Sequence, residues 1–307
     1  MKVGVTILTG ALGAGKSTLI KHLLINNDGI KIGVVINEVG DNSQEIDQTL
    51  AEGHLEDGDF KLDLLDLPSG CVCCTVRGQT LASLEQLVQR RELDIILLET
   101  TGIADPGPIA NDLWADENLE SSIYLDSIVT MVDTIHFQKH NKLGNDIVYK
   151  QISYANTVII NKFDEGIDLT NTIKSINPEC TLLCTNQSKV DIRSIINKHC
   201  FDKIDFKLQH FDSNHLNDYS IKNILIDFNI NKSNFEDWLR NLLWEQHDYE
   251  VYRVKGYLSF QNEENKVGLQ GIMENFEFFP LTTPNDNKSH MIIIGKQLPQ
   301  IDTDLFK

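Results

Sequence analysis

The sequence predicts an α/β fold with a mostly parallel sheet, followed by a smaller α+β domain. Short apolar segments alternate with helical patterns through most of the chain, as strands and crossover helices do in a parallel sheet. Towards the end, strand-like segments instead gather around one amphipathic helix. Because 307 residues also exceed the usual size of one domain, we expect a main domain over residues 1–205 and a second over residues 206–307.

The composition is that of a globular protein with an acidic surface. Hydrophobic residues make up 41% of the chain, and 27 basic residues against 45 acidic ones give a formal net charge of -18. Such a surface repels phosphate backbones, so we expect no nucleic-acid partner. We expect no membrane association, because no apolar run approaches the roughly 20 residues of a membrane helix. Six cysteines are too few for a disulfide framework, which favours a reducing, cytoplasmic location.

The segment after the first expected strand, residues 3–8, has the pattern of a phosphate-binding P-loop. It reads G-A-L-G-A-G-K-S and runs into a helix expected over residues 16–25. In this arrangement backbone N–H groups surround the phosphates, Lys16 reaches the outer phosphates, and the Ser17 hydroxyl faces magnesium. The alternative is a glycine-rich turn that binds nothing. The candidate nucleotide-binding residues of this loop are Gly10, Gly13, Ala14, Gly15, Lys16, Ser17 and Thr18.

A second candidate element follows the apolar strand expected over residues 93–98. The strand leads into Glu99, and Gly102 comes three residues later. A carboxylate at the tip of a buried strand beside a P-loop commonly holds Mg²⁺ through its water shell, and a glycine amide there can approach the γ-phosphate. We therefore expect Lys16 and Glu99 to act in catalysis, with Ser17 and Glu99 as magnesium ligands. The alternative is that Glu99 is an exposed or helix-capping acid.

A base-recognition motif, N-K-x-D, follows a strand expected over residues 157–160. A carboxylate at Asp164 accepts from both N1–H and the exocyclic amine of guanine, which adenine does not present together. We expect the Asn161 amide to bond the ring edge and the Lys162 stem to cover the base face. The predicted nucleotide is therefore GTP. We expect Asp133, at the end of the preceding strand, to be a turn residue.

Three cysteines within four residues form a candidate metal site: Cys71, Cys73 and Cys74. Thiolates favour zinc or Cu(I), and zinc takes four ligands in a closed site. The fourth position is open to Glu38, a histidine, water or a ligand from another protein. Glu38 itself has three interpretations: a zinc ligand, a group that faces magnesium, or a solvated strand-end carboxylate. The alternatives for the cysteines are buried unreactive thiols or a redox pair.

The remaining elements carry no catalytic motif. We expect residues 191–200 to form a helix that closes the main domain. In the second domain we expect a helix capped by Ser233 and strands over residues 221–228, 249–260, 266–277 and 290–295. One helix with about four strands predicts a compact α+β module.

Together these motifs resemble the CobW family of P-loop GTPases over nearly the whole chain, and most of all its eukaryotic zinc-regulated GTPase metalloprotein activators. The resemblance rests on the P-loop, the N-K-x-D motif, the C-x-C-C segment and residues 37–40 and 99–106. It implies binding of Mg-GTP, slow hydrolysis, loading of zinc at the three cysteines, and delivery to a client metalloenzyme. Eukaryotic members often carry an N-terminal docking segment for methionine aminopeptidase. No such segment precedes the strand that begins at Val3, which leaves this client open.

We therefore expect a GTPase whose nucleotide controls a zinc site. Mg-GTP would order the segment from Glu38 to Cys74, which joins the P-loop to Glu99, and hydrolysis would relax it. Because no glutamine or arginine stands where it would orient the hydrolytic water, we expect slow turnover. There are two alternatives: a zinc-dependent GTP sensor that transfers no metal, and an accessory protein of cobalamin biosynthesis, which the soft sulfur ligands disfavour.

Overall fold

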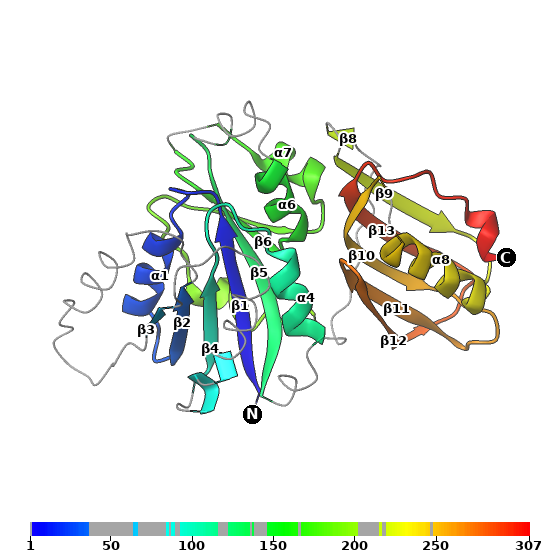
Figure 1. Ribbon diagram of the computed structural model, residues 1–307, viewed down its shortest axis with the longest axis horizontal. Helices are drawn as coiled ribbons and strands as arrows, with labels where there is room; N and C mark the ends of the chain where they lie inside the picture. Colours follow the sequence, from blue (N-terminus) through cyan, green and yellow to red (C-terminus); the bar gives the residue numbers. More distant parts are fainter. Residues whose placement is uncertain are drawn as a thin grey trace. The chain divides into compact units, whose positions relative to one another are not determined.

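Two compact units make up the chain (Figure 1). The first comprises Met1–Gln151, Ala155–Leu169 and Thr181–Cys200, and the second Ile152–Tyr154, Thr170–Cys180 and Phe201–Lys307. The expected domain boundary at residue 205 stays a prediction, because contacts within one chain do not test independent folding. The computed structural model describes residues 2–36, 64–66, 84–85, 87–89, 93–115, 122–135, 137, 146–164, 167–201, 215–216, 219–245 and 248–307.

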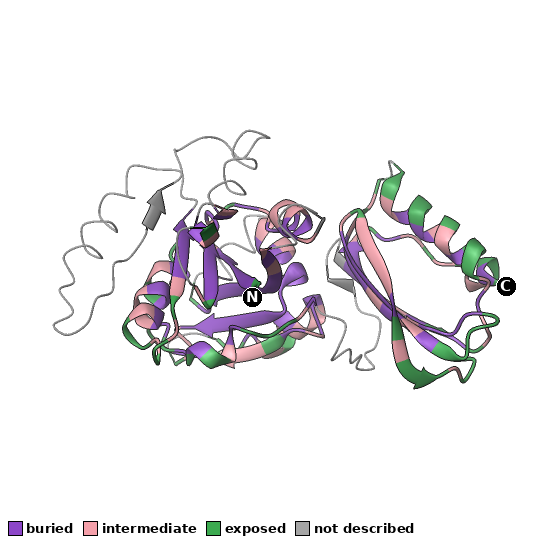
Figure 2. Cartoon of the chain, turned by 90° about the horizontal axis from the view of Figure 1, so that it is seen from below, coloured by how far each residue is buried: buried purple, intermediate pink, exposed green. Residues whose placement is uncertain are grey.

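The first unit is built on a seven-stranded sheet in which every pair of neighbours is parallel, which confirms the predicted α/β fold. Parallel strands are covered on both faces and so read as continuous apolar runs. All eight residues of β1 (Val3–Gly10) are buried, and the sheet is mainly purple in Figure 2. The order is β3-β2-β4-β1-β5-β6-β7, with β1 (Val3–Gly10), β2 (Ile32–Ile36), β3 (Leu64–Asp66), β4 (Ile95–Glu99), β5 (Ile123–Asp133), β6 (Thr157–Asn161) and β7 (Thr181–Cys184).

Helices α1 (Lys16–Ile25), α4 (Gly107–Ala115) and α6 (Asp146–Tyr154) alternate with these strands in the chain. The buried face of α1 joins the core of the unit, where burial of each large aliphatic side chain contributes about 1.5–3 kcal/mol. None of the helices that the structure describes is long and apolar enough to span a membrane. In the core of this unit the helix α1 contributes Leu19, Ile20 and Leu23. The sheet contributes residues that include Val34 of β2, Leu97 of β4 and Val129 of β5.

The strand order reverses at β1, which lies between β4 and β5. In open parallel sheets the crevice beyond the carboxyl ends of the strands at such a point is the usual ligand site. The loops that follow β1, β4 and β5 therefore begin side by side, although β1 and β5 are more than a hundred residues apart in the chain.

The second unit contains a six-stranded antiparallel sheet, which agrees with the predicted smaller domain. Helix α8 (Lys232–Trp244) packs one face against it through Phe235, Leu239 and Leu242, and its other face is exposed (Figure 2). Helix α7 (Thr170–Ile176) also belongs to this unit. The order is β12-β11-β10-β13-β9-β8, with β8 (His215–Leu216), β9 (Tyr219–Ile226), β10 (Glu250–Leu258), β11 (Asn265–Ile272), β12 (Asn275–Pro284) and β13 (Ser289–Lys296).

Two expectations about the second unit are wrong in detail. Residues 266–277 are not one strand, because the chain turns at Met273, which adopts a left-handed φ of 51°. Neither Met273 nor Glu274 is a typical turn residue, so no local pattern predicts this turn. The cap of α8 is Asn231 and not Ser233: the Asn231 side chain accepts from the Asn234 N–H at 3.2 Å.

The expected helix over residues 191–200 is wrong as well. Only Ile192–Ser194 form a single 3₁₀ turn. The backbone N–H groups of His199 and Cys200 instead donate to the buried Asp126, to its side chain at 2.8 Å and to its carbonyl at 2.9 Å. These two N–H groups therefore make hydrogen bonds with a buried residue of β5 and not the bonds of a helix.

Candidate nucleotide-binding site

Five loops meet at one edge of the first sheet. They follow β1, β4, β5, β6 and β7, whose carboxyl ends lie together because the strands are parallel. These loops carry the P-loop, the Glu99 segment, Asp133, the N-K-x-D motif and residues 185–189. The structure therefore brings both predicted nucleotide motifs to one place.

Two positions of the P-loop require glycine because neighbouring atoms lie too close for a Cβ. Gly10 has a φ of 136°, and a Cβ there would lie 2.3 Å from the Met131 carbonyl oxygen of β5. Gly15 has a φ of 109°, and a Cβ there would lie 2.5 Å from both the Asn161 amide nitrogen and the Ser188 hydroxyl. A side chain at either position would force the loop away from its neighbours.

The ammonium of Lys16 lies inside the loop itself. Lys16 is 7% exposed, and its Nζ donates to the carbonyl oxygens of Gly10 at 2.8 Å and Ala11 at 3.4 Å. It starts α1, and Thr18 lies exposed in the same first turn. A helix N-terminus and a fixed cation together favour phosphate groups. The arrangement suits the predicted role of Lys16, which remains a prediction.

Ser17 and Glu99 lie next to each other. The Ser17 hydroxyl donates to Oε1 of Glu99 at 3.3 Å, although 82 residues separate them. Glu99 is only 4% exposed, which argues against a solvated strand-end acid. The Thr100 hydroxyl donates to the Thr9 hydroxyl at 2.8 Å and so joins the ends of β4 and β1. Hydroxyl and carboxylate oxygens are ligands that Mg²⁺ prefers, so this pair fits that ion.

The turn after β4 lies against the P-loop. The Ala104 N–H donates to the Thr101 carbonyl at 3.1 Å, which closes a turn with Gly102 inside it. A Cβ on Gly102 would lie 2.5 Å from the Leu12 backbone nitrogen, so this close approach requires a glycine. Within the described residues, the buried Thr101 hydroxyl finds no hydrogen-bond partner. The turn is thus placed to present backbone and hydroxyl groups to a nucleotide in the P-loop.

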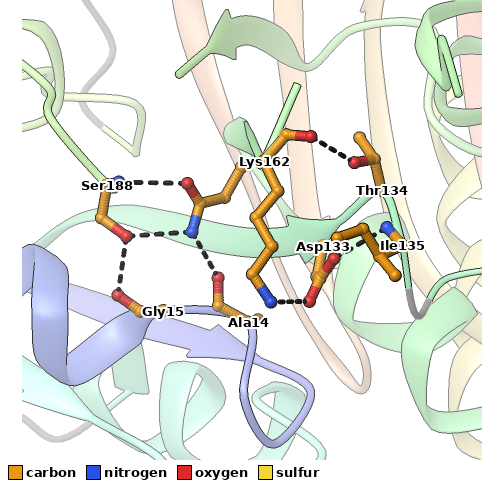
Figure 3. Close-up of polar contacts among 8 residues, drawn as sticks. Ala14, Gly15, Asp133, Thr134, Ile135, Lys162 and Ser188 are labelled. Atoms are coloured by element: carbon orange, nitrogen blue, oxygen red, sulfur yellow. Dashed lines mark hydrogen bonds and ion pairs between the residues drawn. The ribbon is translucent and has the colours of Figure 1, made fainter. Parts of the chain in front are cut away.

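Asn161 differs from its expected role. Its Nδ2 donates to the Ala14 carbonyl at 2.9 Å and to the Ser188 hydroxyl at 3.0 Å, while its Oδ1 accepts from the Ser188 N–H at 3.0 Å (Figure 3). Both amide hydrogens are used within the protein, and the residue is 3% exposed. Asn161 therefore joins the P-loop to the loop after β7 and offers no donor to a base edge.

Asp133 is a site residue that the sequence reasoning missed. Its carboxylate contacts the Lys162 ammonium at 2.5 Å, and it also accepts from the Ile135 N–H at 2.8 Å, as a turn residue would (Figure 3). The Thr134 hydroxyl donates to the Lys162 carbonyl at 2.6 Å. Asp133 comes close to Lys162 because Asp133 of β5 pairs with Asn161 of β6. This strand register cannot be read from the sequence.

The loop after β7 supports the acid of the N-K-x-D motif. Asp164 is exposed; its carboxylate accepts from the Asn186 Nδ2 at 2.5 Å, and its N–H donates to the Asn186 Oδ1 at 3.2 Å. Thr185 is buried and donates its hydroxyl to the Lys189 carbonyl at 2.7 Å. Asn186 and Ser188 were missed because neither belongs to a recognised motif. Asp164 remains open towards solvent, where a base would approach.

The structure does not describe the predicted zinc ligands Cys71, Cys73, Cys74 and Glu38. Among the residues it does describe, no group of three or more His, Cys, Asp or Glu side chains is arranged to hold a metal ion. It does describe the strands that precede these residues in the chain, β2 and β3. Ile36, the last residue of β2, pairs with Asp66, the last residue of β3, and also with Glu99.

Two family models match the chain. The CobW/HypB/UreG nucleotide-binding domain matches residues 4–187, and the cobalamin synthesis protein cobW C-terminal domain matches residues 225–304. The first of these matches spans the P-loop, the Glu99 segment and the N-K-x-D motif. The second falls within the antiparallel sheet and α8.

Curated relatives match over nearly the full chain. Zinc-regulated GTPase metalloprotein activator 1 of Schizosaccharomyces pombe is 32% identical over 346 residues, which cover 97% of this chain and 84% of that protein. Zinc chaperone YjiA of Escherichia coli is 30% identical over 313 residues, covering 97% and 95%. The crystal structure of Zn(II)-bound YjiA GTPase from E. coli matches with a TM-score of 0.72 at 24% identity, over 97% of this chain and 96% of that one, and supports the fold.

Proposed function

Because the chain belongs to the CobW/HypB/UreG family of P-loop GTPases, we propose that it is a zinc metallochaperone in which GTP binding and hydrolysis control a cysteine site. Zinc is the cargo, and it passes to a client metalloenzyme. The names of relatives at least 30% identical to this chain support this, since they are zinc-regulated GTPase metalloprotein activators and a zinc chaperone. Methionine aminopeptidase is the candidate client, and the cytoplasm is the proposed location.

One observation carries the proposed link between nucleotide and metal: Ile36 pairs with both Asp66 and Glu99. Glu38 follows Ile36 by two residues, and Cys71 follows Asp66 by five. Since a chain spans at most about 3.6 Å per residue, two and five residues reach at most about 7 Å and 18 Å from a strand end. The segments proposed to bind metal therefore follow strands that end beside Glu99, the proposed magnesium ligand.

The nucleotide site is proposed to work through residues already placed. The P-loop N–H groups and Lys16 bind the phosphates, and Gly102 presents its N–H to the γ-phosphate. Ser17 and Glu99 hold Mg²⁺, which would neutralise charge on the β- and γ-phosphate oxygens. Asp164 accepts from guanine, and Lys162 lies across the base face. Asn161 acts indirectly, by fixing the P-loop against the loop after β7.

Zinc is proposed to bind the three thiolates of Cys71, Cys73 and Cys74, with Glu38 as the fourth ligand. Three sulfur ligands and one exchangeable oxygen suit a site that must bind and then release its metal. Changing such a site from nearly full to nearly empty requires about 5.5 kcal/mol of difference in binding between the two nucleotide states. Contacts made to the γ-phosphate and its magnesium are lost on hydrolysis and are the proposed source of that difference.

The test is a zinc competition titration against a calibrated chelator, with a Mg-GTP analogue, with Mg-GDP and without nucleotide. We expect zinc affinity to be highest with the analogue and to collapse in Cys73→Ala. Cys184→Ala is the matched control, because Cys184 is an exposed free thiol outside the motif. Equal zinc affinity in all three nucleotide states would contradict the proposed control.

A second experiment separates transfer from sensing. Protein loaded with isotope-labelled zinc is mixed with an apo metalloenzyme, with GTP or with the analogue. Movement of the label on hydrolysis supports delivery. A change in the partner's activity without movement of the label supports the zinc-dependent GTP sensor instead.

A further inference from the structure

Gln151, in α6, bonds directly to the turn that follows β4. Its side-chain Nε2 donates to the Ala104 carbonyl at 3.0 Å and to the Gly102 carbonyl at 3.4 Å. Gln151 is fully buried, so water does not compete for these bonds. The turn it bonds is the one in which Gly102 approaches the P-loop at Leu12.

The orientation of this amide follows from its partners. Carbonyl oxygens only accept hydrogen bonds, so two of them require the NH₂ end of the glutamine. Within the described residues, the Gln151 Oε1 is left buried with no hydrogen-bond partner. A buried carbonyl without a partner lowers stability, and an apolar side chain at this position would avoid that cost. A glutamine at this position is explained if its two donated hydrogen bonds are needed by the nucleotide site as well as by the fold.

Neighbouring contacts hold Gln151 and the turn from two sides. The Thr130 hydroxyl of β5 donates to the Gln151 backbone carbonyl at 2.7 Å, which fixes α6 where the side chain leaves it. The preceding residue, Lys150, forms a 3.6 Å ion pair with Asp105, just beyond the turn. At the other end, Thr100 is bonded to Thr9 of β1. Movement of the turn is therefore restricted at both ends, and Gln151 holds its middle.

We infer that Gln151 is a positioning residue that sets the Gly102 N–H for the γ-phosphate. The Thr101 carbonyl is turned towards the Ala104 N–H, and the Gly102 N–H lies on the opposite side of the same trans peptide group. Fixing the carbonyls of Gly102 and Ala104 prevents that peptide from rotating. This inference rests on the GTP-binding part of the proposed function and not on zinc.

The geometry also distinguishes this role from orientation of the hydrolytic water. The NH₂ group of Gln151 is used by two loop carbonyls, so it acts through the turn and not on a reacting atom. The turn senses only the γ-phosphate, which GDP lacks. Loss of Gln151 therefore lowers affinity for GTP while leaving affinity for GDP unchanged.

The experiment compares wild type with Gln151→Met, which keeps the volume but donates no hydrogen bond. Affinities for Mg-GDP and for a non-hydrolysable Mg-GTP analogue are measured, together with single-turnover hydrolysis of GTP. We expect about a tenfold loss for the analogue, from two lost bonds, a slower single turnover, and unchanged GDP affinity. The matched control is Gln270→Met in β11 of the second unit, where the glutamine is 2% exposed, and it should leave all three measurements unchanged.

A second variant tests the donated bonds even if Gln151→Met folds poorly. In Gln151→Glu, an ionised carboxylate faces two carbonyl oxygens and repels them, whereas the protonated acid can donate one hydrogen bond. We expect affinity for the analogue, relative to wild type, to recover as the pH is lowered. A purely structural role would produce the same pH dependence in the affinity for GDP.

The outcomes separate the two claims. In one outcome, wild type prefers the analogue to GDP, and Gln151→Met and Gln151→Glu keep that preference at every pH. That result would overturn the inference about Gln151 and leave the proposed nucleotide control standing. Equal loss of affinity for the analogue and for GDP overturns it too. If wild type does not distinguish the analogue from GDP, the proposed nucleotide control fails and the role of Gln151 fails with it.

Discussion

The Lys162 ammonium lies 2.5 Å from the carboxylate of Asp133, which joins the N-K-x-D turn to the end of the neighbouring strand β5. The Asp133 side chain is 4% exposed and the Lys162 side chain 30% exposed, so the charge pair is only partly screened by water. Lys162 has a left-handed φ of 56°, which directs its side chain out of the β6 line. The aliphatic stem of Lys162 is thereby held in one position, as stacking against a base requires.

Asp133→Asn should weaken GTP and GDP equally. The variant keeps the side-chain volume and an acceptor for the Ile135 N–H but removes the charge that holds Lys162. We expect a loss of about 1 kcal/mol, near fivefold in affinity, because one partner is partly exposed. Equilibrium titration with fluorescent nucleotides measures it. Asp286→Asn, which removes the ion pair with Lys266 in the second unit, is the control. A loss confined to GTP would contradict a role at the base.

Asp164→Asn should change the preferred base. An asparagine amide presents its NH₂ to the two donors of guanine, so GTP affinity should fall about a hundredfold or more. Xanthine carries a carbonyl oxygen where guanine has an amine, and the new amide can donate to it. Competition of GTP and XTP against a fluorescent GDP measures the exchange of preference. Unchanged GTP affinity would show that Asp164 does not contact the base.

Ser17→Ala and Glu99→Gln should each raise the magnesium concentration needed for hydrolysis. Each variant removes one oxygen ligand or its charge, and we expect the maximal rate to fall about a hundredfold. Rates are measured across a magnesium titration. Ser194→Ala, in the 3₁₀ turn of the first unit, removes a hydroxyl that donates to the Asp191 carbonyl at 2.6 Å and serves as the control. A magnesium dependence equal to that of wild type in both variants would remove these residues from the proposed ion site.

Asp126→Asn should remove a pH-dependent loss of stability. Burial raises the pKa of the Asp126 carboxyl above its ordinary 3.8, although hydrogen bonds from the His199 N–H and the Thr6 hydroxyl oppose this. As pH rises above 3.8, the unfolded chain loses this proton before the folded chain does. The folded state then binds more protons, so the free energy of unfolding falls with rising pH through this window.

The asparagine variant does not titrate, keeps an acceptor for His199, and can donate to the Thr6 hydroxyl. Its stability relative to wild type should therefore increase as pH rises from acid to neutral. Urea unfolding at a series of pH values measures the difference. A difference between variant and wild type that stays constant with pH would mean that the folded and unfolded pKa values of Asp126 are equal.

Local signals predicted some elements of the first unit with nearly their observed bounds. The P-loop glycines and the apolar face that follows placed α1 at residues 16–25, as observed. The strand expected over residues 157–160 is observed as β6, which begins at the same residue and ends one residue later. In both cases the information lies within about ten neighbouring residues, so propensity and apolar pattern suffice.

Distant contacts explain the failures. The segment after Asp191 has a helical pattern, yet its amides at His199 and Cys200 are used by Asp126, some seventy residues earlier. Asp126 itself lies where the β1–β5 register shifts, between the pairs Val5↔Leu125 and Thr6↔Ser127. A buried carboxylate needs hydrogen-bond donors, and here distant residues supply them. No local sequence pattern predicts such contacts.

The sequence by itself determined the kind of site: a P-loop, a strand-end acid, an N-K-x-D motif and a cluster of cysteines, each formed by consecutive residues. Only the tertiary structure decided which groups support them. Asp133 reaches Lys162, Ser188 holds Asn161, and Gln151 holds the turn at Gly102. The first two pairs meet because parallel strands bring their carboxyl ends to one edge of the sheet, and Gln151 reaches the turn from helix α6. Strand order and register decide which of these residues come into contact, and neither can be predicted from a local segment of the sequence.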